Sequence, residues 1–287
     1  MLRKIGITII IVFILVNFIL FGIYIVNSGT SRQVRASVMS SIGDTLSAAN
    51  ITITADKFPV LPATLPIYSA TNALSDKTSI ANAILGPSNY MLAPNQFENN
   101  NEDLIVNGGS FNYSPIGLDD NTLQKLIKPQ TFFAELQAKS VLKQSNLWTS
   151  TSKFTATQND ANSKQTILTV SDMLGKYQVL DSYEKVWVGT DKTKDIRNRI
   201  IVTQINGYNW LNTTYKQEPD SDKRILSIAE VLTKFANSRT DSTPMTITEI
   251  DFGYLVGERA PDSKTVDTDI GLKIVTNQGV TFLSCLQ

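Results

Sequence analysis

The spacing of apolar residues changes repeatedly along the chain between a helical and an extended period. Stretches with apolar residues three or four positions apart are expected to be helices: residues 32–50, 75–85, 119–127, 131–147 and 222–237. Alternating or continuous apolar stretches are expected to be strands: residues 51–54, 90–92, 103–106, 110–113, 153–158, 165–170, 177–180, 184–188, 198–205, 208–216, 245–256 and 269–286. A helix followed by a run of strands occurs three times, which predicts an α+β fold with helices packed on one face of antiparallel sheets.

Glycine, proline and asparagine mark the expected ends of these elements. Ser75 is the expected N-cap of the helix over 75–85, and Gly86-Pro87 ends it. Asn107-Gly108-Gly109 predicts a hairpin, while Asn206-Gly207 and Asn277-Gln278-Gly279 predict turns. Three prolines in eight residues exclude regular structure from the connector over residues 58–66. We place a boundary between two α+β modules, residues 51–117 and residues 118–287.

Two helical stretches are defined by their large apolar residues. In 131–147 these residues are Phe132, Phe133, Leu136, Leu142 and Leu147. In 222–237 the apolar residues share one face of the helix: Ile225, Ile228, Ala229, Leu232 and Phe235. A third stretch, 32–50, has apolar residues every four positions and is expected to continue outward from a membrane.

Residues 5–26 form an apolar run that predicts a transmembrane helix. Of these 22 residues, 18 are apolar and none is charged. At about 1.5 Å per residue the run covers a bilayer core of about 30 Å. Arg3 and Lys4 precede it, so we expect residues 1–4 to be a short cytoplasmic tail and 5–26 an uncleaved signal anchor. Residues 27–50 would form a juxtamembrane helix, and the bulk of the chain would lie outside a single-pass cell membrane protein.

Features of this span are candidates for recognition of a membrane partner. Asn17 lies near mid-membrane, where an amide favours a hydrogen bond to another helix, and Gly22 permits close approach of backbones. The partner-binding candidates are therefore Asn17, Gly22, Arg3 and Lys4.

Composition removes several classes of function. The 287 residues include 26 Lys plus Arg, 26 Asp plus Glu, one Cys and no His. A neutral chain is a poor general binder of nucleic acid. The absence of His excludes His-based catalytic triads and His-ligated metals, and one Cys forms no intramolecular disulfide or cysteine zinc site. An exported protein without disulfides fits a Gram-positive surface. We expect no cofactor, no metal and no catalytic residue.

Some motifs leave other functions open. The S-x-x-K pattern of Ser–Lys hydrolases occurs at Ser140/Lys143, Ser150/Lys153 and Ser182/Lys185, at a frequency that chance explains. Paired carboxylates, among them Glu249 with Asp251, suit a cation site or a glycosidase pair. For Asp119, Asp120, Asp220 and Asp222 helix caps and turns are the simpler explanation, and Asp267 and Asp269 lie near an expected strand end. Tyr208 and Trp210 share one strand face, as a core pair or a sugar-binding pair would. Cys285 is expected to be a small buried apolar group.

The layout of the chain resembles YycI and YycH, membrane-anchored accessory proteins of the WalK-type sensor histidine kinase of Gram-positive bacteria. Glu249-Ile250-Asp251-Phe252-Gly253-Tyr254 resembles the acidic-x-Gly-Tyr strand of those proteins. Residues 269–281, which end in Thr276-Asn277-Gln278-Gly279-Val280-Thr281, resemble their closing hairpin, and 197–216 followed by a helix over 224–237 fits their order.

The resemblance implies a non-enzymatic extracellular regulator of a two-component sensor histidine kinase that controls cell-wall metabolism. Its transmembrane helix would contact the kinase, and its outer modules would contact the kinase or a sister accessory protein. The alternatives are a structural or carbohydrate-binding component of the cell envelope, and an anchored Ser–Lys hydrolase.

Overall fold

The computed structural model describes residues 33–286 except 73–75, 117, 119–122, 124, 161–162, 192–199, 210–211, 220 and 258–264. Within this part of the chain the protein is a mixed α+β structure built mostly from antiparallel strands, as the sequence predicts. None of the helices described has the length and apolar character needed to cross a bilayer. The predicted tail 1–4 and span 5–26 lie outside the described residues.

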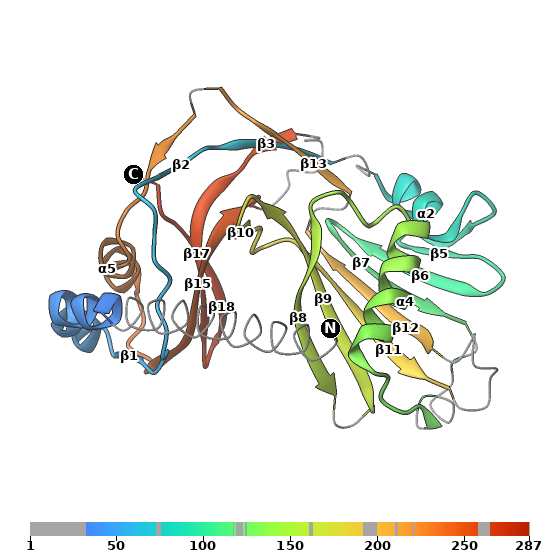
Figure 1. The fold of residues 1–287 in the computed structure, drawn as a ribbon, viewed down its shortest axis with the longest axis horizontal. Coiled ribbons are helices and arrows are strands. Elements are labelled where there is room, and N and C mark those ends of the chain that lie inside the picture. Colours follow the sequence, from blue (N-terminus) through green and yellow to red (C-terminus); the bar gives the residue numbers. More distant parts are fainter. Residues whose placement is uncertain are drawn as a thin grey trace, which may run out of the picture.

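One lobe is built on a nine-stranded antiparallel sheet (Figure 1). Its strands are β4 (Tyr90–Ala93), β5 (Gln96–Glu98), β6 (Glu102–Asn107), β7 (Ser110–Pro115), β8 (Ser152–Asp160), β9 (Gln165–Leu174), β10 (Tyr177–Gln178), β11 (Tyr183–Thr190) and β12 (Ile200–Tyr208). The sheet order is β10-β9-β11-β12-β7-β6-β5-β4, and β8 also pairs with β9. The helices α2 (Lys77–Leu85) and α4 (Thr131–Gln144) pack on one face of this sheet, against β6 and against β9, β11 and β12.

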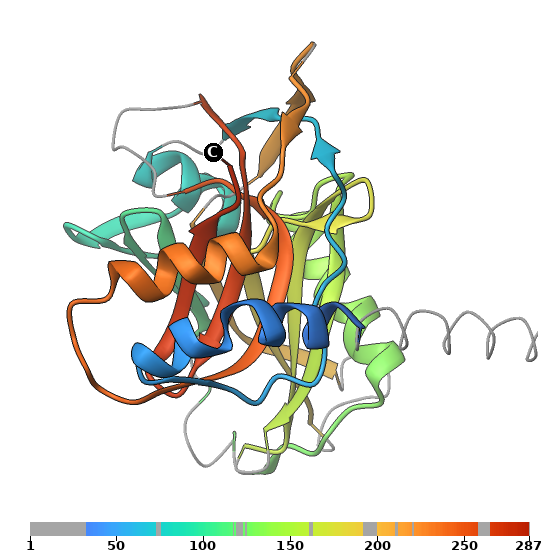
Figure 2. The same ribbon diagram turned by 90° about the vertical axis from the view of Figure 1, so that its left-hand side faces the viewer.

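The other lobe is built on a four-stranded sheet in the order β1-β15-β17-β18. These strands are β1 (Ile51–Ile53), β15 (Met245–Leu255), β17 (Asp269–Thr276) and β18 (Gly279–Ser284). The helix over residues 33–48 and α5 (Ile228–Ser238) cover one face of the sheet (Figure 2). Two small sheets complete this lobe: β2 (Thr64–Leu65) with β14 (Lys223–Arg224), and β3 (Tyr68–Asn72) between β13 (Thr213–Gln217) and β16 (Thr265–Asp267).

The lobes are nested in the chain rather than consecutive. All strands of the nine-stranded sheet come from residues 90–208. In contrast, β1 pairs in parallel with β15, which places Ile51 opposite Met245 from beyond the other end of that segment. We therefore call residues 33–72 with 213–286 the split lobe and residues 76–209 the inserted lobe. The boundary expected at 117–118 does not separate two sheets, because β7 on one side of it pairs with β12 on the other.

Each lobe has its own apolar core. The inserted lobe buries Ile80 and Ile84 of α2 and Leu142 of α4 against the sheet. In the split lobe, residues of the helix over 33–48 and of α5 pack on strands β15 and β17, and Cys285 is fully buried there, as expected. Burial raises the pKa of the Cys285 thiol to about 12, so this thiol stays protonated at neutral pH.

The lobes are joined where β10 meets β15. Leu180 donates a backbone hydrogen bond to Tyr254 at 2.9 Å, next to a parallel bridge between Val179 and Tyr254. Gly253 allows this approach, because a Cβ atom there would lie 2.1 Å from the backbone oxygen of Gln178.

A buried carboxylate strengthens the same junction. The Asp181 carboxylate accepts backbone hydrogen bonds from Val256 at 2.9 Å and Gly257 at 2.8 Å. Burial raises the pKa of Asp181, and these two N–H groups oppose the rise. The amide of Asn209 donates to both Asp181 and Gly257 carbonyl groups at 3.1 and 2.8 Å, so the inserted and split lobes share one hydrogen-bond network.

Several local predictions need correction. The connector over residues 58–66 does contain a short strand, because Thr64 and Leu65 between its prolines pair with β14. The helix α2 is capped by Asp76, which forms a capping box with Ser79, and Ser75 lies outside the described residues. The helix α5 begins at Ile228 rather than at 222, because Ser227 is its N-cap. The expected helix over 119–127 lies largely outside the described residues, and Ile127 forms a bridge with Thr190.

Asn206 and Gly207 do not form the expected turn and instead lie inside β12. Glycine is needed at 207 for a different reason: the ring of Phe111 covers it, and a Cβ atom would lie 1.8 Å from the ring. Gly207 is therefore required by a close side-chain contact within the sheet and not by a turn.

The capping box of α5 is expected to stabilise the protein. The Ser227 hydroxyl accepts from the Glu230 backbone at 3.2 Å, and the Glu230 carboxylate accepts from the Ser227 backbone at 2.7 Å. We expect Ser227→Ala to lower the free energy of unfolding by about 1 kcal/mol, measured by urea denaturation. Ser40→Ala is the control, since Ser40 lies inside the helix over 33–48 and caps nothing; an equal loss in both variants would contradict the prediction.

Candidate functional site

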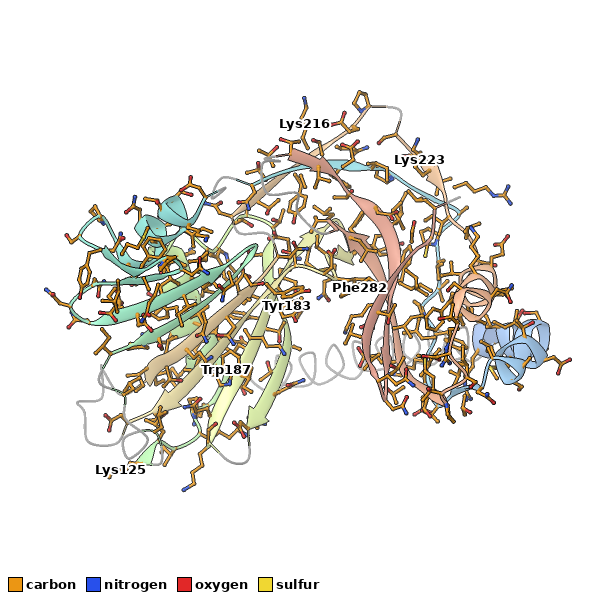
Figure 3. The ribbon with its side chains drawn as sticks, turned by 180° about the vertical axis from the view of Figure 1, so that it is seen from behind. Lys125, Tyr183, Trp187, Lys216, Lys223 and Phe282 are labelled. Carbon is orange, nitrogen blue, oxygen red and sulfur yellow. The ribbon has the colours of Figure 1, made fainter. Side chains whose placement is uncertain are left out.

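The faces of the two main sheets that carry no helix confront each other across an open cleft of about 1100 Å³. Figure 1 shows the space between β8 and β9 of the inserted lobe and β17 and β18 of the split lobe. Seen from behind in Figure 3, Tyr183 and Phe282 lie on opposite sides of this space. We call this space the interlobe cleft. The helices lie on the far face of each sheet, so the cleft is walled by strands.

The split-lobe wall is centred on Lys273 of β17. Strand register places Asp251 of β15 and Phe282 of β18 on either side of it. The Lys273 ammonium lies 3.0 Å from a carboxylate oxygen of Asp251 and 3.0 Å from one of Glu249. Val275 and Val280 extend the same wall as an opposed pair. The wall therefore combines one ion-pair cluster with an apolar strip.

The charges of this cluster depend on one another. Burial and the neighbouring Glu249 raise the pKa of Asp251, and the hydrogen bond with Asp251 lowers the pKa of Glu249. Burial opposes the charge on Lys273, but hydrogen bonds to Asp251 and Glu249 raise its pKa overall. Glu249 and Asp251, which the sequence offered as a cation site or a glycosidase pair, thus both form ion pairs with Lys273 in the cleft.

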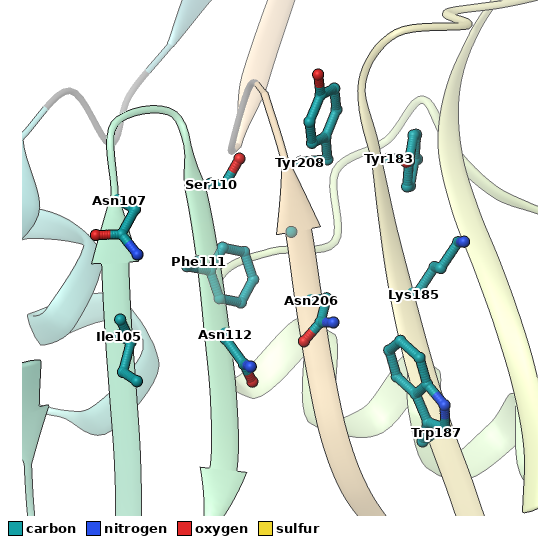
Figure 4. A pocket seen from close by; sticks show the side chains of 11 residues that line it. Ile105, Asn107, Ser110, Phe111, Asn112, Tyr183, Lys185, Trp187, Asn206 and Tyr208 are labelled. Carbon is teal, nitrogen blue, oxygen red and sulfur yellow. The ribbon is translucent and has the colours of Figure 1, made fainter. Parts of the chain in front are cut away.

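The inserted-lobe wall is a face of aromatic rings and side-chain amides (Figure 4). Tyr183 of β11 stacks on Tyr208 of β12 with ring centroids 5.4 Å apart and planes 21° apart. Lys185 lies over Tyr183, its ammonium 5.6 Å from the ring centroid. Tyr183, Lys185 and Tyr208 line the cleft. Trp187 follows on the same face of β11, outside the cleft lining. Tyr208 is 47% exposed, so much of its ring is free to meet a ligand.

The amides continue this face away from the cleft, from β12 to β7. Gln204 donates to the Oδ1 of Asn206 at 2.9 Å and to that of Asn112 at 3.4 Å. Asn112 and Asn206, together with Trp187 and Tyr208, border a shallow depression of about 490 Å³. We call this depression and its rim the aromatic–amide face: Ile105, Asn107, Ser110, Phe111, Asn112, Tyr183, Lys185, Trp187, Gln204, Asn206, Gly207 and Tyr208.

A second acidic group lies behind this wall, on the core side of β11. Burial, and then the neighbouring Asp172, raise the pKa of Glu184 well above its usual range. The Asp172 carboxylate accepts from the hydroxyl groups of Thr149 and Thr151 at 2.9 Å each and from Tyr215 of the split lobe at 3.2 Å. Glu184 is therefore part of the buried interior, and Asp172 links the inserted lobe to the split lobe through Tyr215.

Glu184 predicts a pH dependence of stability. The unfolded chain loses the Glu184 proton near pH 4.5, but the folded protein keeps it to higher pH. The folded state then binds more protons, so this group lowers the free energy of unfolding as the pH rises, by at most about 1.4 kcal/mol per pH unit for one proton. We expect Glu184→Gln to reduce this slope in urea denaturation from acid to neutral pH. The exposed control Asp56→Asn should keep it, and an unchanged slope in Glu184→Gln would refute the assignment.

The sequence-predicted candidates are scattered. Asn17, Gly22, Arg3 and Lys4 lie outside the described residues, as does Trp210. Of the S-x-x-K pairs, Ser140 and Lys143 are exposed on α4, Ser150 and Lys153 are exposed beside the start of β8, and Ser182 is buried while Lys185 lines the cleft. Sequence reasoning noted Tyr208 but missed Tyr183, Gln204, Asn206 and Asn112. The period-two alternation of β11 and β12 could have indicated one shared face for most of them.

Comparisons with known proteins give a distant structural likeness. No protein-family model matches the chain. No curated protein matches it. A crystal structure of an uncharacterized protein from Eubacterium rectale is similar with a TM-score of 0.44 and 10% identity, over 82% of this chain and 87% of that chain.

Proposed function

We propose that this protein is a non-enzymatic binding protein anchored at the outer face of the cell membrane, where it regulates a sensor histidine kinase. The observation that supports binding most directly is the interlobe cleft, walled by two lobes that meet at the short β10–β15 junction. An anchor over residues 5–26 and the resemblance in layout to membrane-anchored kinase accessory proteins support the kinase as the partner.

The geometry suggests how binding would be transmitted. A partner segment or ligand held by both walls favours one spacing of the lobes, because it touches Phe282 and Lys273 on one side and Tyr183 and Tyr208 on the other. If the protein binds one kinase state more tightly than the other, it shifts the equilibrium toward that state by the difference between the two binding free energies. No chemical step is required of the cleft.

The kinase assignment is tested by a pull-down of the full-length chain from its native membrane in mild detergent. We expect a sensor kinase to copurify and to be lost when residues 5–26 are replaced by an unrelated membrane span, or when Asn17 is changed to leucine in a matched variant. Copurification that is equal with either span would assign the contact to the outer part. Absence of a kinase in every sample would overturn the kinase assignment and leave the cleft to be tested separately.

Carbohydrate binding is a second candidate, favoured by the aromatic–amide face. Sugars stack their apolar C–H faces on aromatic rings and exchange hydrogen bonds with planar amides, and this face offers Tyr208 and Trp187 beside Asn112, Gln204 and Asn206. Its one lysine, Lys185, is partly engaged with Tyr183, which suits an uncharged glycan better than a polyanion.

Tyr208→Ala tests this candidate by sedimentation of the purified protein with cell-wall glycan. We expect the variant to lose about tenfold in affinity, the effect of about 1–1.5 kcal/mol for one aromatic contact. Tyr90→Ala is the matched control, because Tyr90 is 51% exposed on β4 and Tyr208 is 47% exposed in the cleft. Binding that Tyr208→Ala and Tyr90→Ala reduce equally would exclude the aromatic–amide face as the glycan site.

A further inference from the structure

The helix α4 carries large apolar side chains on the face that points away from its own sheet. Phe132, Phe133 and Leu136 are 64%, 48% and 52% exposed. The face against the sheet is instead made of small or aliphatic residues: Ala134, Ala138 and Leu142. We call Phe132, Phe133 and Leu136 the α4 patch. These side chains contribute little to the core, and exposed apolar clusters of this kind are typical of surfaces that bind a partner or a membrane.

The apolar surface extends from α4 to the start of β8. A depression of about 600 Å³ beside the patch is lined by four apolar side chains, by two lysines and Glu135, and by three hydroxyl residues; the apolar ones are Phe132, Leu136, Trp148 and Phe154. The rings of Trp148 and Phe154 lie 5.2 Å apart, and the Lys139 ammonium lies 4.7 Å from the Trp148 ring centroid. Aromatic and aliphatic side chains with a lysine above them are typical of surfaces that lie at a membrane interface.

The segment that carries this surface is rich in lysine. Within the described residues from 123 to 153 there is one acidic side chain, Glu135, and there are five lysines, of which Lys139 and Lys153 line the depression: Lys125, Lys128, Lys139, Lys143 and Lys153. All but Lys139 of these lysines are exposed. The whole chain has no net charge, so the positive charge is concentrated locally in this segment. A local excess of lysine complements anionic lipid head groups.

The attachment point of the predicted anchor and α4 lie toward one face of the molecule, at opposite ends of its long axis. In Figure 2 the N-terminal end of the helix over 33–48, drawn in dark blue, and α4, drawn in light green, both lie toward the right-hand side, and Figure 1 shows the two helices at opposite ends. Residues 27–32 separate the predicted span from this helix, and six residues extend at most about 20 Å. A span ending at residue 26 therefore brings the bilayer surface within about 20 Å of the start of this helix, and a bilayer that lies along the face described above meets α4 as well.

We propose that the α4 patch lies on the anionic lipid surface beside the anchor, with Phe132, Phe133 and Leu136 at the head-group level. This inference rests on the membrane anchor of the proposed function. It gives the outer part a second attachment to the bilayer, on the inserted lobe, whereas the anchor is attached to the split lobe. The lysines around the patch contact the lipid phosphates.

The test uses the full-length chain reconstituted in vesicles of phosphatidylcholine and phosphatidylglycerol with brominated acyl chains, which quench fluorophores at the membrane. An environment-sensitive fluorophore is attached to Leu136→Cys, and to Val280→Cys on β18 as the matched control. Both native residues are 52% exposed, and Cys285 is fully buried and stays unlabelled. We expect bromolipid to remove most of the emission at 136 and to leave emission at 280 unchanged.

The outcomes separate the patch from the anchor. If the chain floats with the vesicles but the label at 136 is no more quenched than the label at 280, the lipid contact is overturned and a protein partner becomes the occupant of the patch. If the chain does not float, the anchor itself fails. Phe132→Ser with Phe133→Ser should restore emission at 136, and vesicles of phosphatidylcholine alone should weaken the quenching, because they remove the anionic charge. Quenching that persists in both cases would contradict the proposed contact.

Discussion

Gly253→Ala is expected to separate the two lobes and to lower the free energy of unfolding by about 2–3 kcal/mol, the upper part of the range for overpacking. The added Cβ atom would lie 2.1 Å from the backbone oxygen of Gln178 and 3.0 Å from Leu180. A backbone oxygen cannot rotate away as a side chain does, so β10 and β15 must move apart. This movement weakens the hydrogen bond from Leu180 to Tyr254 and widens the interlobe cleft.

Urea denaturation and small-angle scattering measure the two effects together. The control is Gly43→Ala in the helix over 33–48, where a Cβ atom would meet nothing within 4 Å. That variant should gain up to about 1 kcal/mol, because alanine loses less backbone entropy than glycine. A Gly253→Ala protein with unchanged stability and unchanged scattering would show that the junction absorbs the methyl group, and the lobes would then not be positioned by this contact.

Gly207→Ala is expected to have a comparable cost, inside one lobe rather than between two. The new Cβ atom would lie 1.8 Å from Cε1 and 2.3 Å from Cδ1 of Phe111, whose side chain is 3% exposed. The ring must leave its position in the core of the inserted lobe, at a cost of about 2–3 kcal/mol. Near-ultraviolet circular dichroism should change as well, since β12 also carries Asn206 and Tyr208 of the aromatic–amide face.

A double-mutant cycle isolates this contact. Phe111→Leu alone should destabilise the protein by leaving a small cavity. Combined with Gly207→Ala it should cost less than the sum of the two single changes, because the smaller side chain leaves room for the methyl group. Additive effects in the cycle would place the clash elsewhere.

The elements that the sequence predicted well are those with a strong local signal. The hairpin of β6 and β7 forms around Asn107-Gly108-Gly109, and β17 and β18 turn at Asn277-Gln278 as expected. A short turn needs a few residues with special backbone freedom, and these are visible in the sequence. The pairing of β1 with β15 has no such signal, because its partners are 194 positions apart.

The helix α4 shows why the candidate surfaces were harder to predict. Its phenylalanines helped to predict a helix here, but it is Ala134 and Ala138 that lie against the sheet, where small residues allow close approach. Hydrophobicity identified the helix and not its orientation. The aromatic–amide face was missed for a related reason: Tyr183, Gln204 and Asn112 belong to three strands, and only the register of those strands brings them together.

The nesting of one lobe inside the other has a consequence for how the chain acquires its structure during synthesis. The last strand of the inserted lobe ends at Tyr208, so that lobe has all of its sheet once this residue has emerged. At that moment β1 has emerged but its neighbour Met245 has not. Chains are made from the N-terminus, and pairing between distant residues is slow. The inserted lobe therefore folds as the earlier unit, and the split lobe closes around it last.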